Sequence, residues 1–113
     1  MIMNATDWNT ALYEKMSDEQ DKFRDWLKGQ PPEEILHHTY EYTVREDIVM
    51  AMEQLELTDA QAQALLDSSS PLADVYRYFE KLETGYMDVI RDSIENRADD
   101  VCRAQEELRT APL

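Results

Sequence analysis

The apolar residues in the last third of the chain recur at steps of three and four. This spacing places them on one stripe of an α-helix. Ser70 suits the N-cap position, and Pro71 suits the first helical position, where no backbone N–H is needed. The pattern predicts one long helix over residues 71–108, about 57 Å in length, on which the rest of the chain would pack. The stripe consists of Leu72, Val75, Tyr76, Phe79, Leu82, Tyr86, Val89, Ile90, Ile94, Val101 and Leu108.

Three shorter helices are predicted before it, over residues 7–28, 33–56 and 59–66. Gly29 and the prolines that follow end the first of them, and its apolar arc contains Glu19, an acid for which the pattern gives no reason. Thr58 and Gln61 form the capping-box signature of the third helix. The predicted core positions are Trp8, Leu12, Met16, Phe23, Trp26 and Leu27 in the first helix, and Tyr40, Val44, Ile48, Ala51 and Leu55 in the second.

These elements predict an all-α fold. No stretch alternates apolar and polar residues with a period of two for long enough to indicate a strand. The chain has 113 residues, enough for one hydrophobic core, and its two glycines and four prolines allow few turns. We therefore expect a single domain over residues 1–113, built as a four-helix bundle with one long C-terminal helix.

Several classes of protein are excluded by composition. Cys102 is the only cysteine, so an intramolecular disulfide and a multi-cysteine zinc site are both impossible. No charge-free apolar run approaches the roughly 18 residues of a membrane span. The N-terminal residues lack the basic and apolar regions of a signal peptide. We expect a cytoplasmic protein that does not contact membranes.

The charge of the chain is strongly negative and unevenly distributed. The formal net charge is −14 and the pI is about 4.3. Such a field repels nucleic acid and anionic membranes and attracts basic protein surfaces. In the first and last predicted helices, acids stand three or four residues from Lys or Arg, as expected of solvated outer faces. Residues 30–69, in contrast, carry nine acids and a single base, Arg45.

The acids of this middle segment are candidates for a partner-binding surface. Glu46 and Glu53 are predicted to point away from the core, beside Tyr42 and Val49, so that acids and apolar groups would share one docking face. The alternative is that Tyr42 and Val49 pack against another helix while the acids face water. The candidate partner-binding residues are Glu34, Glu41, Tyr42, Glu46, Val49, Glu53, Glu56 and Asp59.

No motif in the sequence indicates catalysis or a cofactor. A glycine-rich phosphate loop, a nucleophile elbow and an HExxH motif are all absent. A carboxylate metal site in a helical bundle uses paired Glu-x-x-His motifs, and Glu34 with His37 supplies only one. We expect no catalytic residue, no cofactor and no metal. The 11 dispersed cations make direct binding of nucleic acid improbable.

The segments LYEKMSDEQDKFRDWLKGQPPEEIL and YEYTVREDI, together with residues 59–80, resemble a family of small acidic proteins of unknown function. Members of that family occur on plasmids, conjugative elements and prophages of Gram-positive gut bacteria. The resemblance spans residues 12–98 and carries over no catalytic residue. It implies that the protein belongs to the accessory cargo of mobile DNA, which includes inhibitors of host defence nucleases.

Two functions from different classes follow as hypotheses. The first is a non-enzymatic inhibitor of the anti-CRISPR or anti-restriction type, whose acids between residues 30 and 69 mimic nucleic acid in the basic groove of a nuclease. The second is a helical adaptor or self-associating protein without nucleic-acid mimicry, in which the apolar ends of the long helix pair with another chain. The protein would then be a monomer in the first case and a homodimer in the second.

Overall fold

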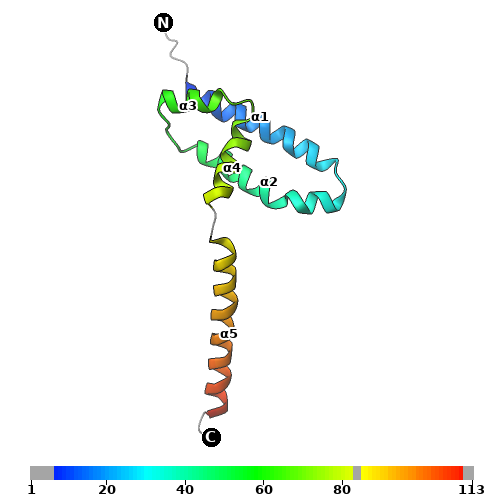
Figure 1. Cartoon of the computed structure of the whole chain (residues 1–113), viewed down its shortest axis with the longest axis vertical. Coiled ribbons are helices and arrows are strands. Elements are labelled where there is room, and N and C mark those ends of the chain that lie inside the picture. The colour runs from blue at the N-terminus through cyan, green and yellow to red at the C-terminus, as the bar shows by residue number, and fades with distance from the viewer. Residues whose placement is uncertain (1–6, 83–84, 111–113) are drawn as a thin grey trace. The chain divides into compact units, whose positions relative to one another are not determined.

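The computed structural model describes residues 7–82 and 85–110 of the chain, and these residues form five helices (Figure 1). No described residue lies in a β-strand, so the all-α prediction is confirmed. None of the described helices is both long and apolar enough to cross a membrane. The helices are α1 (Trp8–Lys28), α2 (Pro32–Met52), α3 (Asp59–Leu66), α4 (Pro71–Leu82) and α5 (Tyr86–Thr110).

The chain divides into two units, residues 1–79 and residues 80–113. The first contains α1, α2, α3 and most of α4, and the second contains α5. In the first unit, α1 packs along both α2 and α3. The expected four-helix bundle with one long C-terminal helix is not matched exactly, because the described residues form five helices divided between two units.

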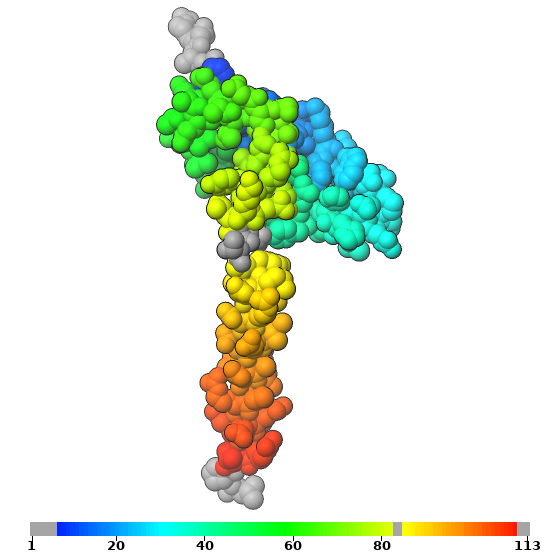
Figure 2. All heavy atoms as spheres, in the orientation of Figure 1, coloured from blue at the N-terminus to red at the C-terminus, as the bar shows by residue number. Residues whose placement is uncertain are grey.

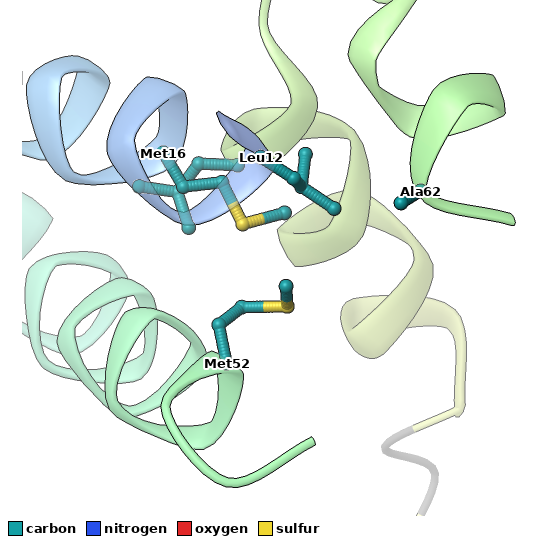
Figure 3. Packing of buried hydrophobic residues seen from close by; sticks show 5 residues of the cluster. Leu12, Met16, Met52 and Ala62 are labelled. Carbon is teal, nitrogen blue, oxygen red and sulfur yellow. The ribbon is translucent and has the colours of Figure 1, made fainter. Parts of the chain in front are cut away.

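The hydrophobic core of the first unit joins its four helices. Met16 of α1 and Met52 of α2 point toward one another, and Leu12 of α1 lies next to Ala62 of α3 (Figure 3). Leu72 at the start of α4 completes the cluster and is fully buried. The partly buried residues packed around this cluster are Trp8, Tyr13, Ile48, Val49, Leu57, Leu65, Leu66 and Val75.

The prediction of one long helix over residues 71–108 is wrong. The helix that begins at Pro71 ends at Leu82, and α5 begins at Tyr86; residues 83 and 84 lie outside the described residues. Gly85 accepts the first helical hydrogen bond of α5, from the Val89 N–H at 2.9 Å. A glycine inside a helix costs about 1 kcal/mol relative to alanine, which disfavours a continuous helix through Gly85.

The apolar stripe of that predicted helix is buried only in its first part. Leu72 and Tyr76 are buried, and Val75 and Phe79 are half-buried. From Leu82 onward the apolar residues are exposed, apart from the half-buried Ile90. The stripe therefore belongs to the core only as far as the first unit extends.

The predicted core face of α2 is confirmed only in part, because Ile48 packs against the core and Val44 is half-buried. Tyr40, Ala51 and Leu55 are exposed, and α2 ends at Met52 instead of residue 56. The buried residues of α2 are Arg45 and Met52, and Val49 also packs against the core, so the inward face is rotated from Ile48 toward the side that was expected to face solvent. The apolar pattern misplaced this face because its central buried residue is an arginine.

Polar side chains cap the N-termini of α1 and α3. Asp7 caps α1 by accepting a hydrogen bond from the Thr10 N–H at 3.1 Å, and its bonds to the hydroxyl and N–H of Thr10 lower the pKa of Asp7. The capping box of α3 is confirmed. The Thr58 hydroxyl accepts from the Gln61 N–H, and the Gln61 side chain accepts from the Thr58 N–H.

The N-terminus of α4 is capped by a residue far away in sequence. The two carboxylate oxygens of Glu19, on α1, accept hydrogen bonds from the N–H groups of Leu72 at 2.8 Å and of Ala73 at 2.9 Å. A carboxylate is favourable at a helix N-terminus because the first N–H groups lack partners within the helix. This contact explains why an acid interrupts the apolar arc of α1.

Candidate protein-binding surfaces

Four of the eight predicted partner-binding residues are half-buried and contact other residues of the fold. Arg24 of α1 donates a hydrogen bond from Nε to the Tyr42 hydroxyl at 2.8 Å, and its Nη2 lies 3.0 Å from Oε1 of Glu46. The amide of Gln20 donates to the same Glu46 oxygen at 2.9 Å. The bond to Tyr42, followed by the bond to Asp21, raises the pKa of Arg24 further above its ordinary value. Glu46 is thus neutralised within the fold.

Arg45, the base that the sequence placed alone among nine acids, is buried between α1 and α4. Its guanidinium stacks over Phe23, with 4.3 Å between the guanidinium carbon and the ring centroid. Its Nη2 lies 2.7 Å from Glu41, and its Nη1 lies 3.9 Å from Glu19. Within the described residues, Arg45 Nε has no hydrogen-bond partner. Glu41 is therefore also held in an internal ion pair.

The eight predicted residues consequently separate into two groups. Val49 packs against the hydrophobic core, Tyr42 and Glu46 are held by side chains of α1, and Glu41 pairs with Arg45 on its own helix. The sequence missed Gln20 and Arg24 as partners of Tyr42 and Glu46, and Glu19 as a partner of Arg45. The only signal for these was the presence of polar residues close to or within the apolar arc of α1. The remaining members, which are exposed, are Glu34, Glu53, Glu56 and Asp59.

Two of the exposed acids line a groove between the start of α1 and the end of α2. The groove has a volume of about 660 Å³, and Glu53 and Glu56 form part of its wall. The Tyr13 hydroxyl donates a hydrogen bond to Glu53 at 3.2 Å, which raises the pKa of Tyr13. The other lining residues are Asp7, Asn9, Thr10, Met52, Leu55 and Leu57.

Glu34 lies at a different place, on the first turn of α2. Its carboxylate is 3.7 Å from Nε2 of His38, whose ring packs edge-on against Trp26 with 5.2 Å between the ring centroids. No group of three or more His, Cys, Asp or Glu side chains suited to a metal ion occurs in the described part of the chain.

The second surface is the apolar face of α5, and none of the described residues of this helix is buried. Met87, Ile94, Val101 and Leu108 follow one another at intervals of seven residues. Their exposed fractions are 54%, 65%, 37% and 80%. The described residues of the second unit are those of α5, Gly85 and the last three residues of α4. The atoms of α5 run from yellow to red in Figure 2.

Comparisons with known proteins identify the family without giving an activity. A family model described as "Protein of unknown function (DUF3848)" matches residues 8–102, which include α1 to α4 and the first two thirds of α5. No curated protein and no solved structure matches the chain. The matched range covers most of the sequence, and the chain therefore belongs to the DUF3848 family of proteins of unknown function.

Proposed function

We propose that the protein is a non-enzymatic protein-binding protein whose α5 docks against a helix of matching seven-residue repeat. The observation that carries this proposal is the exposed row of Met87, Ile94, Val101 and Leu108. Soluble proteins seldom expose a continuous apolar stripe unless it serves an interaction. A short isolated helix is marginal in water, and helices in proteins gain most of their stability from packing of an apolar face.

The period of the stripe favours a helical partner. A straight α-helix has 3.6 residues per turn, so a row with strict seven-residue spacing drifts around its surface by about 20° per repeat. A partner helix can follow that drift by supercoiling, whereas a flat protein surface cannot. The chemistry of the partner is thus an amphipathic helix with apolar residues at the same period.

Site-specific photocrosslinking in cells that produce the full chain tests this proposal. A photoreactive amino acid at Ile90 or Val101 on the apolar face is expected to give a discrete adduct. The matched control positions are Asp92 and Asp99, which lie on the opposite face of the same helix. Adducts of equal yield from both faces, or none from either, would show that α5 is not a docking helix.

A second candidate function rests on the acids that remain exposed. Glu53 and Glu56 on the wall of the groove, with Asp59 two residues beyond the groove-lining Leu57, present negative charge to solvent. They support the hypothesis of a nucleic-acid-mimicking inhibitor carried by a mobile element, on a smaller surface than the sequence suggested. Glu41 and Glu46 no longer count toward it, because Arg45 and Arg24 pair with them.

Charge reversal tests this second candidate. We expect the wild type to inhibit DNA cleavage by a purified CRISPR effector or restriction nuclease, and inhibition to weaken as salt rises. The triple variant Glu53→Lys, Glu56→Lys, Asp59→Lys should lose inhibition. The control, Glu14→Lys, Asp18→Lys, Asp25→Lys, makes the same change in charge on the exposed face of α1 and should retain it. Equal effects of the two triple variants, or no inhibition by the wild type, would contradict mimicry at the groove.

A further inference from the structure

We infer that the helix that covers α5 is α5 of a second copy of this chain, and that the two helices run antiparallel with Arg97 of each beside Asp100 of the other. This inference rests on the proposed docking role of α5 and adds the identity, direction and register of its partner. It is argued from the positions of the charged residues around the seven-residue repeat.

The contact face of α5 contains one charged residue. In a two-stranded coiled coil, two positions of each seven-residue repeat, separated by three residues, meet the partner helix. Met87, Ile94, Val101 and Leu108 occupy the first of these positions. The second position is occupied by Ile90, Arg97 and Ala104, which follow Met87, Ile94 and Val101 by three residues. Arg97 is therefore the charged group that any pairing of α5 must accommodate, and within the described residues no ion pair involves it.

A parallel pair in register would place the two Arg97 side chains opposite one another. Residues at equivalent positions form the same layer in that arrangement. Two guanidinium groups would then be partly removed from water next to a like charge, and both effects oppose association. Arg97 consequently selects against the parallel pair.

An antiparallel pair has a register that avoids this repulsion. In antiparallel coiled coils, a residue of the first contact position faces one of the second position on the other helix. Ile90 can then face Leu108, and Ile94 can face Ala104, so that the outer layers of the contact are apolar. The remaining two central layers pair Arg97 with Val101.

The same register supplies each Arg97 with a counter-charge. Asp100 directly precedes Val101 in the sequence. It lies beside the contact face, at the edge that is nearer to Arg97 than to Val101. The Asp100 of one helix is then offset from the Arg97 of the other by one residue, about 1.5 Å along the axis. The centre of the pair would contain two arginines and two aspartates, which is an electrically neutral cluster.

Asp100 is available for this role. Its carboxylate is 2.8 Å from Arg103 Nη2 in the structure, but the two side chains are 58% and 72% exposed. Ion pairs at that exposure contribute little to stability. The flanking positions on the other side of the contact bring Ala98 near Ala98 and Arg91 near Gln105, so no like charges meet on that side.

Charge exchange in the full chain, with the mass measured by sedimentation equilibrium over a micromolar concentration series, tests the inference. We expect a dimer for the wild type and at least a roughly tenfold higher dissociation constant for Arg97→Asp and for Asp100→Arg. The double variant exchanges both members of each pair and should return to about the wild-type value. Asp92→Arg, on the outer face of α5, is the matched control and should dimerise normally.

Disulfide trapping tests the direction of the pair. In a Cys102→Ser background, a chain with Ile94→Cys is mixed with a chain with Ala104→Cys and oxidised. The antiparallel register predicts the mixed disulfide between positions 94 and 104, whereas a parallel pair would give only 94–94 and 104–104 products.

The outcomes separate this inference from the proposed function. A wild type that stays monomeric, single and double charge variants that dissociate equally, or parallel disulfides would each overturn the self-pairing. If adducts form from Ile90 and Val101 but have the mass of a different protein, self-pairing is wrong while docking through α5 stands. If the two faces of α5 give equal adducts, the proposed function itself fails.

Discussion

Leu72→Ala is expected to lower the free energy of unfolding of the first unit by about 3–5 kcal/mol, the range for a leucine that leaves a cavity on truncation. Leu72 is fully buried and lies where α4 meets the core residues of α1, α2 and α3. The total stability of a domain of this size is about 5–15 kcal/mol. The variant should therefore lose a large fraction of it.

Urea unfolding followed by tryptophan fluorescence measures this effect, because Trp8 and Trp26 both lie on α1 and so report on the first unit. The matched control is Leu108→Ala, which truncates a leucine that is 80% exposed. On a monomeric chain its effect should stay within about 0.5 kcal/mol. Equal losses from the two variants would mean that the stripe from Leu72 to Leu108 is buried throughout, as the sequence pattern alone suggested.

The contrast between these two leucines illustrates what periodicity can and cannot predict. Helical spacing correctly indicates that both residues lie in helices and on apolar faces. Whether a face is buried depends on a second element that covers it, and the spacing within one helix contains no information about that element. For this reason the start of α4 at Pro71 and both bounds of α3 were predictable. The exposure of the stripe beyond Phe79 was not.

The inward face of α2 and the pairing of Tyr42 and Glu46 with α1 differ from the sequence prediction for a related reason. A sequence pattern treats a charged residue as solvent-exposed, yet Arg45 lies over Phe23 and beside Glu41 and is 9% exposed. A buried charge is tolerated when it is paired, and its partners lie on α1 as well as on its own helix. Tyr42 and Glu46 were assigned to the surface because Arg24 and Gln20, which hold them, are more than 15 residues away in the sequence.

Glu19→Ala is the second change with a large expected effect, a loss of about 3 kcal/mol in the stability of the first unit. The substitution leaves the N–H groups of Leu72 and Ala73 without an acceptor, and each unsatisfied buried group costs about 1–3 kcal/mol. It also removes a carboxylate from the neighbourhood of the buried guanidinium of Arg45, 3.9 Å away. Glu14→Ala removes an exposed acid from the same helix and should change stability by no more than about 0.5 kcal/mol.

Amide hydrogen exchange distinguishes the capping role of Glu19 from a general loss of stability. If the carboxylate holds the start of α4, Glu19→Ala should accelerate exchange at Leu72 and Ala73 by a larger factor than at Met16 or Met52, which exchange through unfolding of the whole unit. Glu19→Gln should give an intermediate loss, because one amide oxygen can still accept while the NH₂ group faces a backbone donor. Uniform acceleration at all four amides would mean that Glu19 contributes through the Arg45 contact alone. The acid within the apolar arc of α1 would then be a partner for a buried cation and not the cap that connects α1 to α4.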